Sequence, residues 1–332
     1  MNNKNLHSDY LGKFSHHLQQ VLLDGNNRDS NHVISPSRLQ AVLVLLANWA
    51  SASIKKEILA RVGNGSLSLE EANMLTSRKC LFLTPDDWCD KMAKEKAIPI
   101  IEQQALMWVK KELEVNRDAV AKIAEDFDIT LHSVDFSDKD LKSIMDAAIS
   151  EATHGQIKEL DLQLTKETMA VISDILYFRA SWDSPFEEYD TKEQIFYGTK
   201  GKSKVPMMKM TDHWDYRETK TFQMVSLDYR CWAKEKRNFA MRVYIPKTKC
   251  SLCDMLNEIG NVEGELCVER QEVKLSLPRF TVEETIDLKE ILPELGLGFI
   301  FESDDITPGC IKDLKIQQFI TPVRDKIAIS CM

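Results

Sequence analysis

Two cysteines separated by two residues have a spacing that fits either a metal site or a redox site. Cys250 and Cys253 form this single C-x-x-C motif. A structural zinc site needs four ligands, and no second pair is placed to complete one. A thioredoxin-like motif needs a βαβ context, which the neighbouring sequence lacks. The two residues are therefore predicted to be free thiols in a helix, with nothing bound.

The histidines and carboxylates also lack a catalytic or metal-binding arrangement. No histidine is spaced as a metal ligand from another histidine, a cysteine or a carboxylate. The adjacent acids Glu187-Glu188 and Asp304-Asp305 are typical of solvated charge rather than of an acid–base pair. Nucleophile-elbow, Walker and dinucleotide-binding motifs do not occur in the sequence. The sequence therefore predicts no enzyme, no cofactor and no metal.

The composition limits which classes of protein and which partners are possible. The chain has 332 residues, of which 43% are hydrophobic and 29% charged, typical of a globular protein with a large core. Its net charge is −9, without a dense basic block, which argues against nucleic acid or an anionic membrane as the main partner. No apolar run reaches about 18 residues, so no membrane span is predicted.

The amino-terminal residues contain no apolar run of signal-peptide length. The eight cysteines are therefore interpreted as free thiols rather than as a disulfide framework. Together these features predict a cytoplasmic protein.

Helix signals occur along most of the chain. Ser35 and Pro36 are typical of an N-cap and a first helical residue, and a broad apolar face follows them. A second helix is predicted from Ser53, ending at Gly63. A short helix is predicted from Asp287, with Pro293 inside it and Gly296 at its end. Further helices are predicted at residues 117–126, 138–152 and 250–259.

The strand signals are shorter and do not alternate regularly with the helices. Residues 170–178 are almost continuously apolar around one acidic residue, which indicates a strand buried on both faces. Further strands are predicted at residues 107–109, 129–134, 239–245 and 273–278. This pattern predicts a single α+β domain, and the pattern alone assigns no element within residues 302–332.

Several stretches resemble, in their order along the chain, the motifs of the serpin family, and specifically of its plant type. Each match is weak alone, but their common order over residues 9–301 is specific. The matching stretches include Val33–Pro36, Thr153–Ile157, Ile175–Trp182, Val205–Met208, Leu277–Phe280 and Asp287–Glu290.

The resemblance implies a fold of three β-sheets with eight or nine helices, in which the large central sheet is mobile. It also implies an activity. An inhibitory serpin presents a reactive loop that a protease attacks to form an acyl-enzyme. The cut loop then inserts into the central sheet as a new strand and distorts the protease.

The resemblance weakens after Phe301. There the family continues with a strand ending in His-Lys, an acidic hinge, a run of alanines, the reactive loop and two further core strands, none of which is recognised here. Residues 316–320 and Pro322 suit a sliding hinge poorly. The expectation is an incomplete serpin domain at residues 1–301 and a divergent tail at 302–332, lacking the reactive loop and the final core strands.

A non-inhibitory serpin-like protein is therefore predicted, with a protease or another protein as its partner. One alternative is an active serine or cysteine protease inhibitor that uses a loop in the tail, where Arg324 and Lys326 offer tryptic bonds. Another is a protein-binding scaffold. Strand edges left unpaired by the missing strands would favour association with other chains. The resemblance also allows an extracellular location.

By resemblance, Ser35, Arg38 and Asp174 lie where the central sheet of a serpin opens. The family has neutral groups there, a serine at the position of Arg38 and an asparagine at that of Asp174. Because a buried charge needs a partner, we expect Arg38 and Asp174 to form a buried ion pair that holds this region shut. The alternative is that Arg38 points to solvent.

Overall fold

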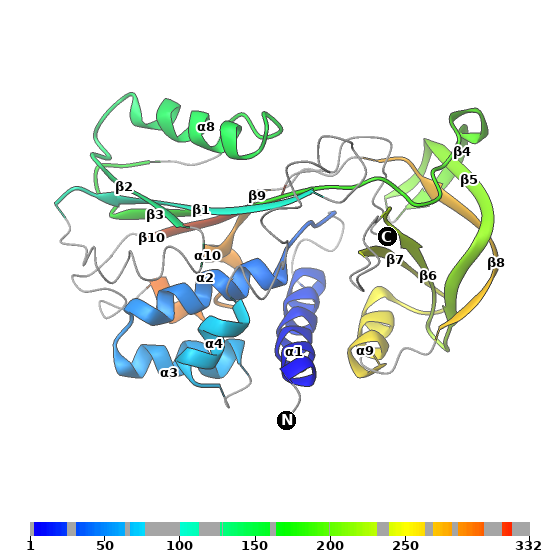
Figure 1. Cartoon of the computed structure of the whole chain (residues 1–332), viewed down its shortest axis with the longest axis horizontal. Helices are drawn as coiled ribbons and strands as arrows, with labels where there is room; N and C mark the ends of the chain where they lie inside the picture. The colour runs from blue at the N-terminus through cyan, green and yellow to red at the C-terminus, as the bar shows by residue number, and fades with distance from the viewer. Residues whose placement is uncertain are drawn as a thin grey trace.

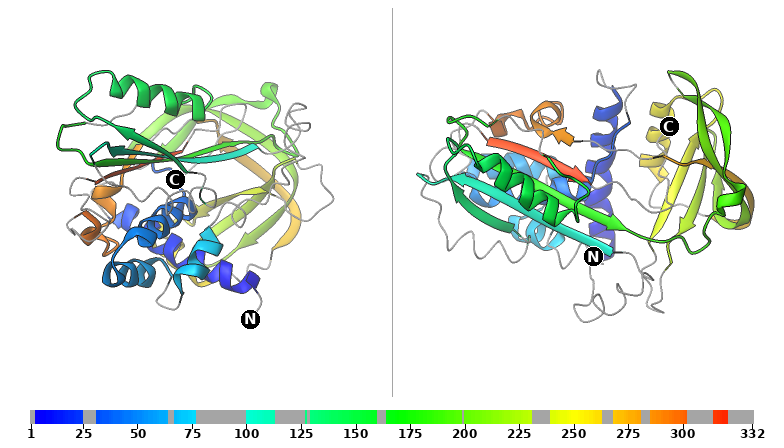
Figure 2. Two further views of the ribbon diagram at one scale, coloured as in Figure 1. Left: turned by 60° about the vertical axis from the view of Figure 1, so that its left-hand side comes forward. Right: turned by 90° about the horizontal axis from the view of Figure 1, so that it is seen from above.

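The computed structural model describes residues 3–24, 31–63, 67–76, 100–112, 127, 129–159, 164–198, 200–230, 239–262, 268–280, 285–301 and 314–320. These residues form two sheets with helices packed around them (Figures 1 and 2). No helix in these ranges is both long enough and apolar enough to cross a membrane.

The first sheet has five strands in the order β2-β1-β3-β10-β9. Their bounds are β1 Ile100–Lys110, β2 Ile129–Val134, β3 Ala170–Arg179, β9 Thr285–Asp287 and β10 Leu314–Ile320. β3 is central, with an antiparallel neighbour in β1 and a parallel neighbour in β10. β10 also pairs antiparallel with β9, so it joins β9 to the rest of the sheet.

Helices cover both faces of this sheet (Figure 1). Helix α8 (Leu141–Ala152) lies on one face, where Met145 and Ile149 pack against Val171 of β3. On the other face Ile172 belongs to the main core, formed largely with α2 (Pro36–Trp49) and α3 (Ala52–Val62). α4 (Leu69–Thr76) packs against α2. Successive β3 side chains therefore enter two different cores, which confirms the prediction of a strand buried on both faces.

The second sheet is built on the long strand β5 (Gly201–Glu218). β5 pairs with β4 along its first part, with β6 at its end and with β8 on its other side. The remaining bounds are β4 Lys192–Gly198, β6 Phe222–Asp228, β7 Ala240–Pro246 and β8 Glu269–Pro278. Where three sheets were expected, the described residues form two, because β5 runs continuously through both sets of pairings.

Two helices and a short turn accompany the second sheet. The apolar side of α9 (Leu252–Val262) packs on Phe222 and Met224 of β6. α1 (Asn3–Asp24) lies against both α9 and α2, between the two halves of the molecule (Figure 1). The 3-10 turn η1 (Glu188–Asp190) directly precedes β4.

The predicted helix ends are largely confirmed. The Ser35 side chain accepts a hydrogen bond from the Arg38 N–H, and Pro36 is the first residue of α2. α3 ends at Val62, with Gly63 as its C-cap. The predicted helix at residues 117–126 lies outside the described residues.

The prediction that Pro293 lies within a helix is wrong. α10 (Leu288–Ile291) ends before it, and Pro293 lies in the turn that leads to the short helix η3 (Gly298–Phe301). Proline cannot donate the next helical hydrogen bond, so the helix stops one turn early. Gly296 closes this turn at φ 71°, a conformation that favours glycine.

The expectation that no family strand follows Phe301 is also wrong. Residues 314–320 form β10, which pairs with the central strand β3 from Leu314↔Ala170 to Ile320↔Leu176. The local pattern of these residues carries no strong strand signal. β10 is a strand because its backbone groups pair with β3 on one side and with β9 on the other. Such long-range partners cannot be recognised in the local sequence.

Candidate functional site

The candidate site lies where α2 begins, beneath β1 and β3 and beside the ladder that joins β3 to β10. We call this ladder, residues 170–176 against 314–320, the β3–β10 seam. Ser35 stands at the start of α2 and is buried. Its hydroxyl caps the helix and lies 3.3 Å from the Ser37 hydroxyl. Ser35 thus fixes the first turn of α2, which carries Arg38.

Arg38 points into the protein, because its residue is only 2% exposed. Its Nε donates to Oδ1 of Asp174 over 2.8 Å, and its Nη2 donates to the same oxygen. Its Nη1 donates to Oε1 of Gln103 over 2.9 Å. The predicted ion pair is therefore confirmed, and the alternative that Arg38 points to solvent is wrong.

Asp174 lies in the middle of β3 and is fully buried. Its backbone faces Ala105 of β1 on one side and Gln318 of β10 on the other. Its side chain shares the α2 side of the sheet with Ile172, whereas Val171 and Ile175 face α8. Asp174 therefore joins the strand at the seam to the helix beneath it.

Gln103 is the member of the site that sequence reasoning missed. It lies on β1, is 6% exposed and shares a face with the core residues Ala105 and Met107. Its Nε2 has no hydrogen-bond partner among the described residues. A glutamine in phase with core positions of a strand was the available signal, but its arginine partner lies 65 residues away in the sequence.

The hydrogen bonds of this cluster hold a helix and two strands together. Arg38 and Asp174 balance each other's charge, and the positive charge at the start of α2 would otherwise oppose the helix dipole. Two hydrogen bonds to Asp174 and one to Gln103 tie α2 to both β3 and β1. In the part of the chain that the structure describes, no group of three or more His, Cys, Asp or Glu residues is placed to hold a metal ion.

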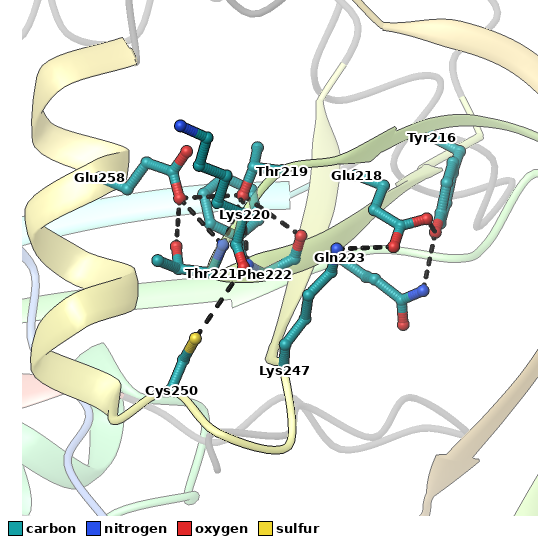
Figure 3. Close-up of polar contacts among 10 residues, drawn as sticks. All are labelled: Tyr216, Glu218, Thr219, Lys220, Thr221, Phe222, Gln223, Lys247, Cys250 and Glu258. Carbon is teal, nitrogen blue, oxygen red and sulfur yellow. Dashed lines mark hydrogen bonds and ion pairs between the residues drawn. The ribbon is translucent and has the colours of Figure 1, made fainter.

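A second polar cluster joins α9 to the turn between β5 and β6 (Figure 3). Oε2 of Glu258 accepts hydrogen bonds from the Thr221 hydroxyl, the Thr221 N–H and the Thr219 hydroxyl. The Thr221 hydroxyl bond is the largest cause holding the pKa of Glu258 below its usual value. Because these polar groups are hydrogen-bonded to one another, we interpret the cluster as a structural link between the helix and the turn.

The cysteine pair lies next to this tie. Cys250 and Cys253 are partly exposed and form no disulfide. The Cys250 thiol lies 3.9 Å from the Lys220 carbonyl oxygen (Figure 3). The predicted helix begins later than expected, because Ser251 and Asp254 form a reciprocal capping box that starts α9 at Leu252. Cys250 therefore precedes the helix.

A central sheet covered on both faces by helices, a second sheet built on one long strand, and a buried site under the central sheet define the class of protein. The sequence model of the family described as "Serpin (serine protease inhibitor)" matches residues 9–326. The chain belongs to the serpin family. The match extends past Phe301 and includes β10.

Curated relatives include both inhibitors and a protein named as non-inhibitory. A serine protease inhibitor of the mouse, Mus musculus, is 26% identical over 309 residues, 89% of this chain and 70% of that protein. A probable non-inhibitory serpin of Arabidopsis thaliana is 26% identical over 294 residues, 86% of this chain and 64% of that protein.

Solved structures show the same fold. An Arabidopsis serpin in its native stressed conformation superimposes with a TM-score of 0.78 at 20% identity, covering 98% of this chain and 87% of that one. Human thyroxine-binding globulin, in complex with thyroxine, gives a TM-score of 0.80 at 18% identity, with 98% and 88% covered. Serpins are thus in general protease inhibitors or binding proteins rather than catalysts.

Proposed function

We propose that this serpin does not trap proteases by strand insertion and instead binds a protease or another protein without a covalent step. The observation that carries the proposal is the buried Arg38–Asp174 pair on the β3 side of the β3–β10 seam. The family has neutral groups at these two positions, so the pair adds an electrostatic link between α2 and the strand next to which the sheet would have to open.

Insertion requires the two halves of the sheet to move apart. A new strand between β3 and β10 would separate them by one additional strand spacing, about 4.8 Å. α2 is tied to the β3 side through Arg38 and Gln103. On the other side α10 contacts β10, and Leu288 and Leu292 share the main core with α2. The helix is therefore attached to both halves that must part.

The energetic consequence follows from the burial of the charges. If α2 stays with the half of the molecule that contains α10 and β10, a shift of one strand spacing carries the Asp174 carboxylate out of hydrogen-bond reach of Arg38 while both groups are inside the protein. Breaking a buried pair so that one charge is left uncompensated costs about 3–5 kcal/mol. In that movement the pair favours the closed sheet over the open one by an amount of this order.

The residues that follow β10 support the same proposal. They read Thr321-Pro322-Val323-Arg324-Asp325-Lys326. Pro322 has no N–H to donate in a central ladder, and adjacent charged residues are costly to insert between buried strands. The competing candidate is an inhibitor cleaved at Arg324 or Lys326. It is supported by the position of β10, since these residues lie four and six positions after the end of that strand.

A gel assay tests the proposal. The purified protein is incubated with trypsin-like, chymotrypsin-like and papain-like proteases and then run under denaturing conditions. We expect only degradation fragments and undiminished protease activity. A covalent band at the summed mass would show that the proposal is wrong. The Arg38→Ser/Asp174→Asn variant, which has the family's neutral groups, runs in parallel and shows whether removing the ion pair alone permits trapping.

A further inference from the structure

Three of the six exposed large hydrophobic side chains among the described residues lie within one short segment. Tyr189 is 73% exposed, Ile195 51% and Tyr197 68%. All three belong to η1 and β4, which follow one another in the chain. We call residues 188–204, which comprise η1, β4 and the start of β5, the β4 edge. Gathered exposed hydrophobics of this kind mark an interaction site.

β4 is also an edge strand. In the described part of the chain it pairs only with β5, from Lys192↔Met207 to Gly198↔Gly201. The backbone groups along its other side therefore have no strand partner among the described residues. β4 contains no proline to block a further strand. Its length and its extended backbone suit β-augmentation.

The charges differ between the two ends of the β4 edge. Glu188, Asp190 and Glu193 lie toward its start with one lysine, Lys192, among them, whereas Lys200, Lys202 and Lys204 lie toward the hairpin end. The Lys202 ammonium is 5.2 Å from the ring centroid of Tyr197. In an antiparallel pairing with a second copy, the acidic end of each strand meets the basic end of the other. A parallel pairing would bring like charges together.

We infer that the β4 edge binds the same edge of a second copy of this chain, in an antiparallel twofold pair. With Ile195 of the two copies opposite each other, Glu193 of one copy faces Tyr197 of the other. Lys202 already lies beside that ring, so the Glu193 carboxylate reaches its ammonium across the interface. Twofold symmetry forms this contact twice, which is the self-complementarity that an isologous interface requires.

The pair is a weak and reversible dimer. One strand of seven residues on each copy gives a small contact. Interfaces below about 1,200 Å² are typical of transient association. The inference does not depend on whether the protein inhibits proteases, because the β4 edge belongs to the second sheet and the β3–β10 seam to the first.

Sedimentation velocity of the full chain over a wide concentration range tests the inference. We expect a monomer–dimer equilibrium that weakens as salt is raised, since exposed charge pairs are screened. Ile195→Lys puts two like charges at the centre of the pair and should abolish the dimer, with an unchanged melting temperature because Ile195 is exposed. A monomer at every concentration, or a dimer indifferent to Ile195→Lys, would overturn the inference.

A charge exchange separates this geometry from any other dimer. Lys200→Glu/Lys202→Glu makes both ends acidic, and Asp190→Lys/Glu193→Lys makes both ends basic. Each variant alone should be monomeric, and an equimolar mixture should restore a dimer. Lys166→Glu/Lys274→Glu makes the same charge change elsewhere on the surface and should leave the dimer intact. Failure of the mixture to pair, or loss of the dimer in the control, would refute the antiparallel arrangement.

Discussion

Replacing Arg38 with alanine removes the partner of a fully buried carboxylate. Asp174 is 0% exposed, and the arginine supplies two hydrogen bonds to its Oδ1. Gln103 loses its bond to the guanidinium as well. Leaving a buried charge uncompensated costs about 3–5 kcal/mol. At about 2–4 °C per kcal/mol for domains of 150–250 residues, Tm should fall by roughly 6–20 °C, toward the lower end for a longer chain.

The assay is urea unfolding together with calorimetry on five proteins: wild type, Arg38→Ala, Arg38→Ser, Asp174→Asn and the Arg38→Ser/Asp174→Asn double variant. Each single variant should be strongly destabilised. The double variant should return to within about 1–2 kcal/mol of wild type, because replacing both members of a buried pair is often neutral or stabilising. The cycle therefore yields a favourable coupling energy between the two side chains.

A Tm for Arg38→Ala within about 1 °C of wild type would contradict this expectation, because the pair would then not be a buried charge interaction. Simple addition of the two single-variant effects in the double variant would contradict it as well. That result would mean that each residue stabilises the protein through other neighbours. Either outcome would remove the main support for a sheet that resists opening.

Three further predictions concern other parts of the structure. The hydrogen bonds from Thr221 lower the pKa of Glu258, so this carboxylate stabilises the fold above its unfolded pKa and loses that contribution as pH falls. In Glu258→Gln, the free energy of unfolding in urea should therefore decrease less between about pH 6 and pH 3 than in wild type. Burial raises the pKa of Tyr229 to about 12, so the neutral side chain's contribution to stability is lost as pH rises above the ordinary tyrosine pKa. Tyr229→Phe should therefore reduce alkaline unfolding, which is followed by tyrosinate absorbance. Gly296→Ala should cost about 1–2 kcal/mol in urea unfolding, because φ is 71° there, whereas Gly298→Ala, at negative φ, should cost less.

Much of the fold was predictable because its signals are local. The cap at Ser35, the first-turn position of Pro36 and the end of α3 at Gly63 each depend on residues within one turn. The continuous apolar run of β3 indicated burial on both faces for the same reason. Pro293 was misplaced because a weak capping signal from Asp287 predicted a longer helix than the proline allows.

The ion pair was predictable in a different way. Arg38 and Asp174 are 136 residues apart in the sequence, so no local pattern connects them. Their departure from the family's neutral groups suggested a compensated change, and the structure confirms that they meet. Gln103 could not be found by this reasoning, because its contact with Arg38 depends on how β1 lies against β3.

The helix caps, the buried central strand, the serpin motifs and two opposite charges that need each other can all be recognised in the amino-acid sequence. They follow from periodicity, capping and the cost of an unpaired buried charge. Other features emerge only when the chain is folded: residues 314–320 complete the central sheet, Glu258 ties α9 to a turn, and β4 lies at an edge with opposite charges at its ends. Strand neighbours and long-range hydrogen bonds depend on the register between distant segments, which the packing of the whole chain selects.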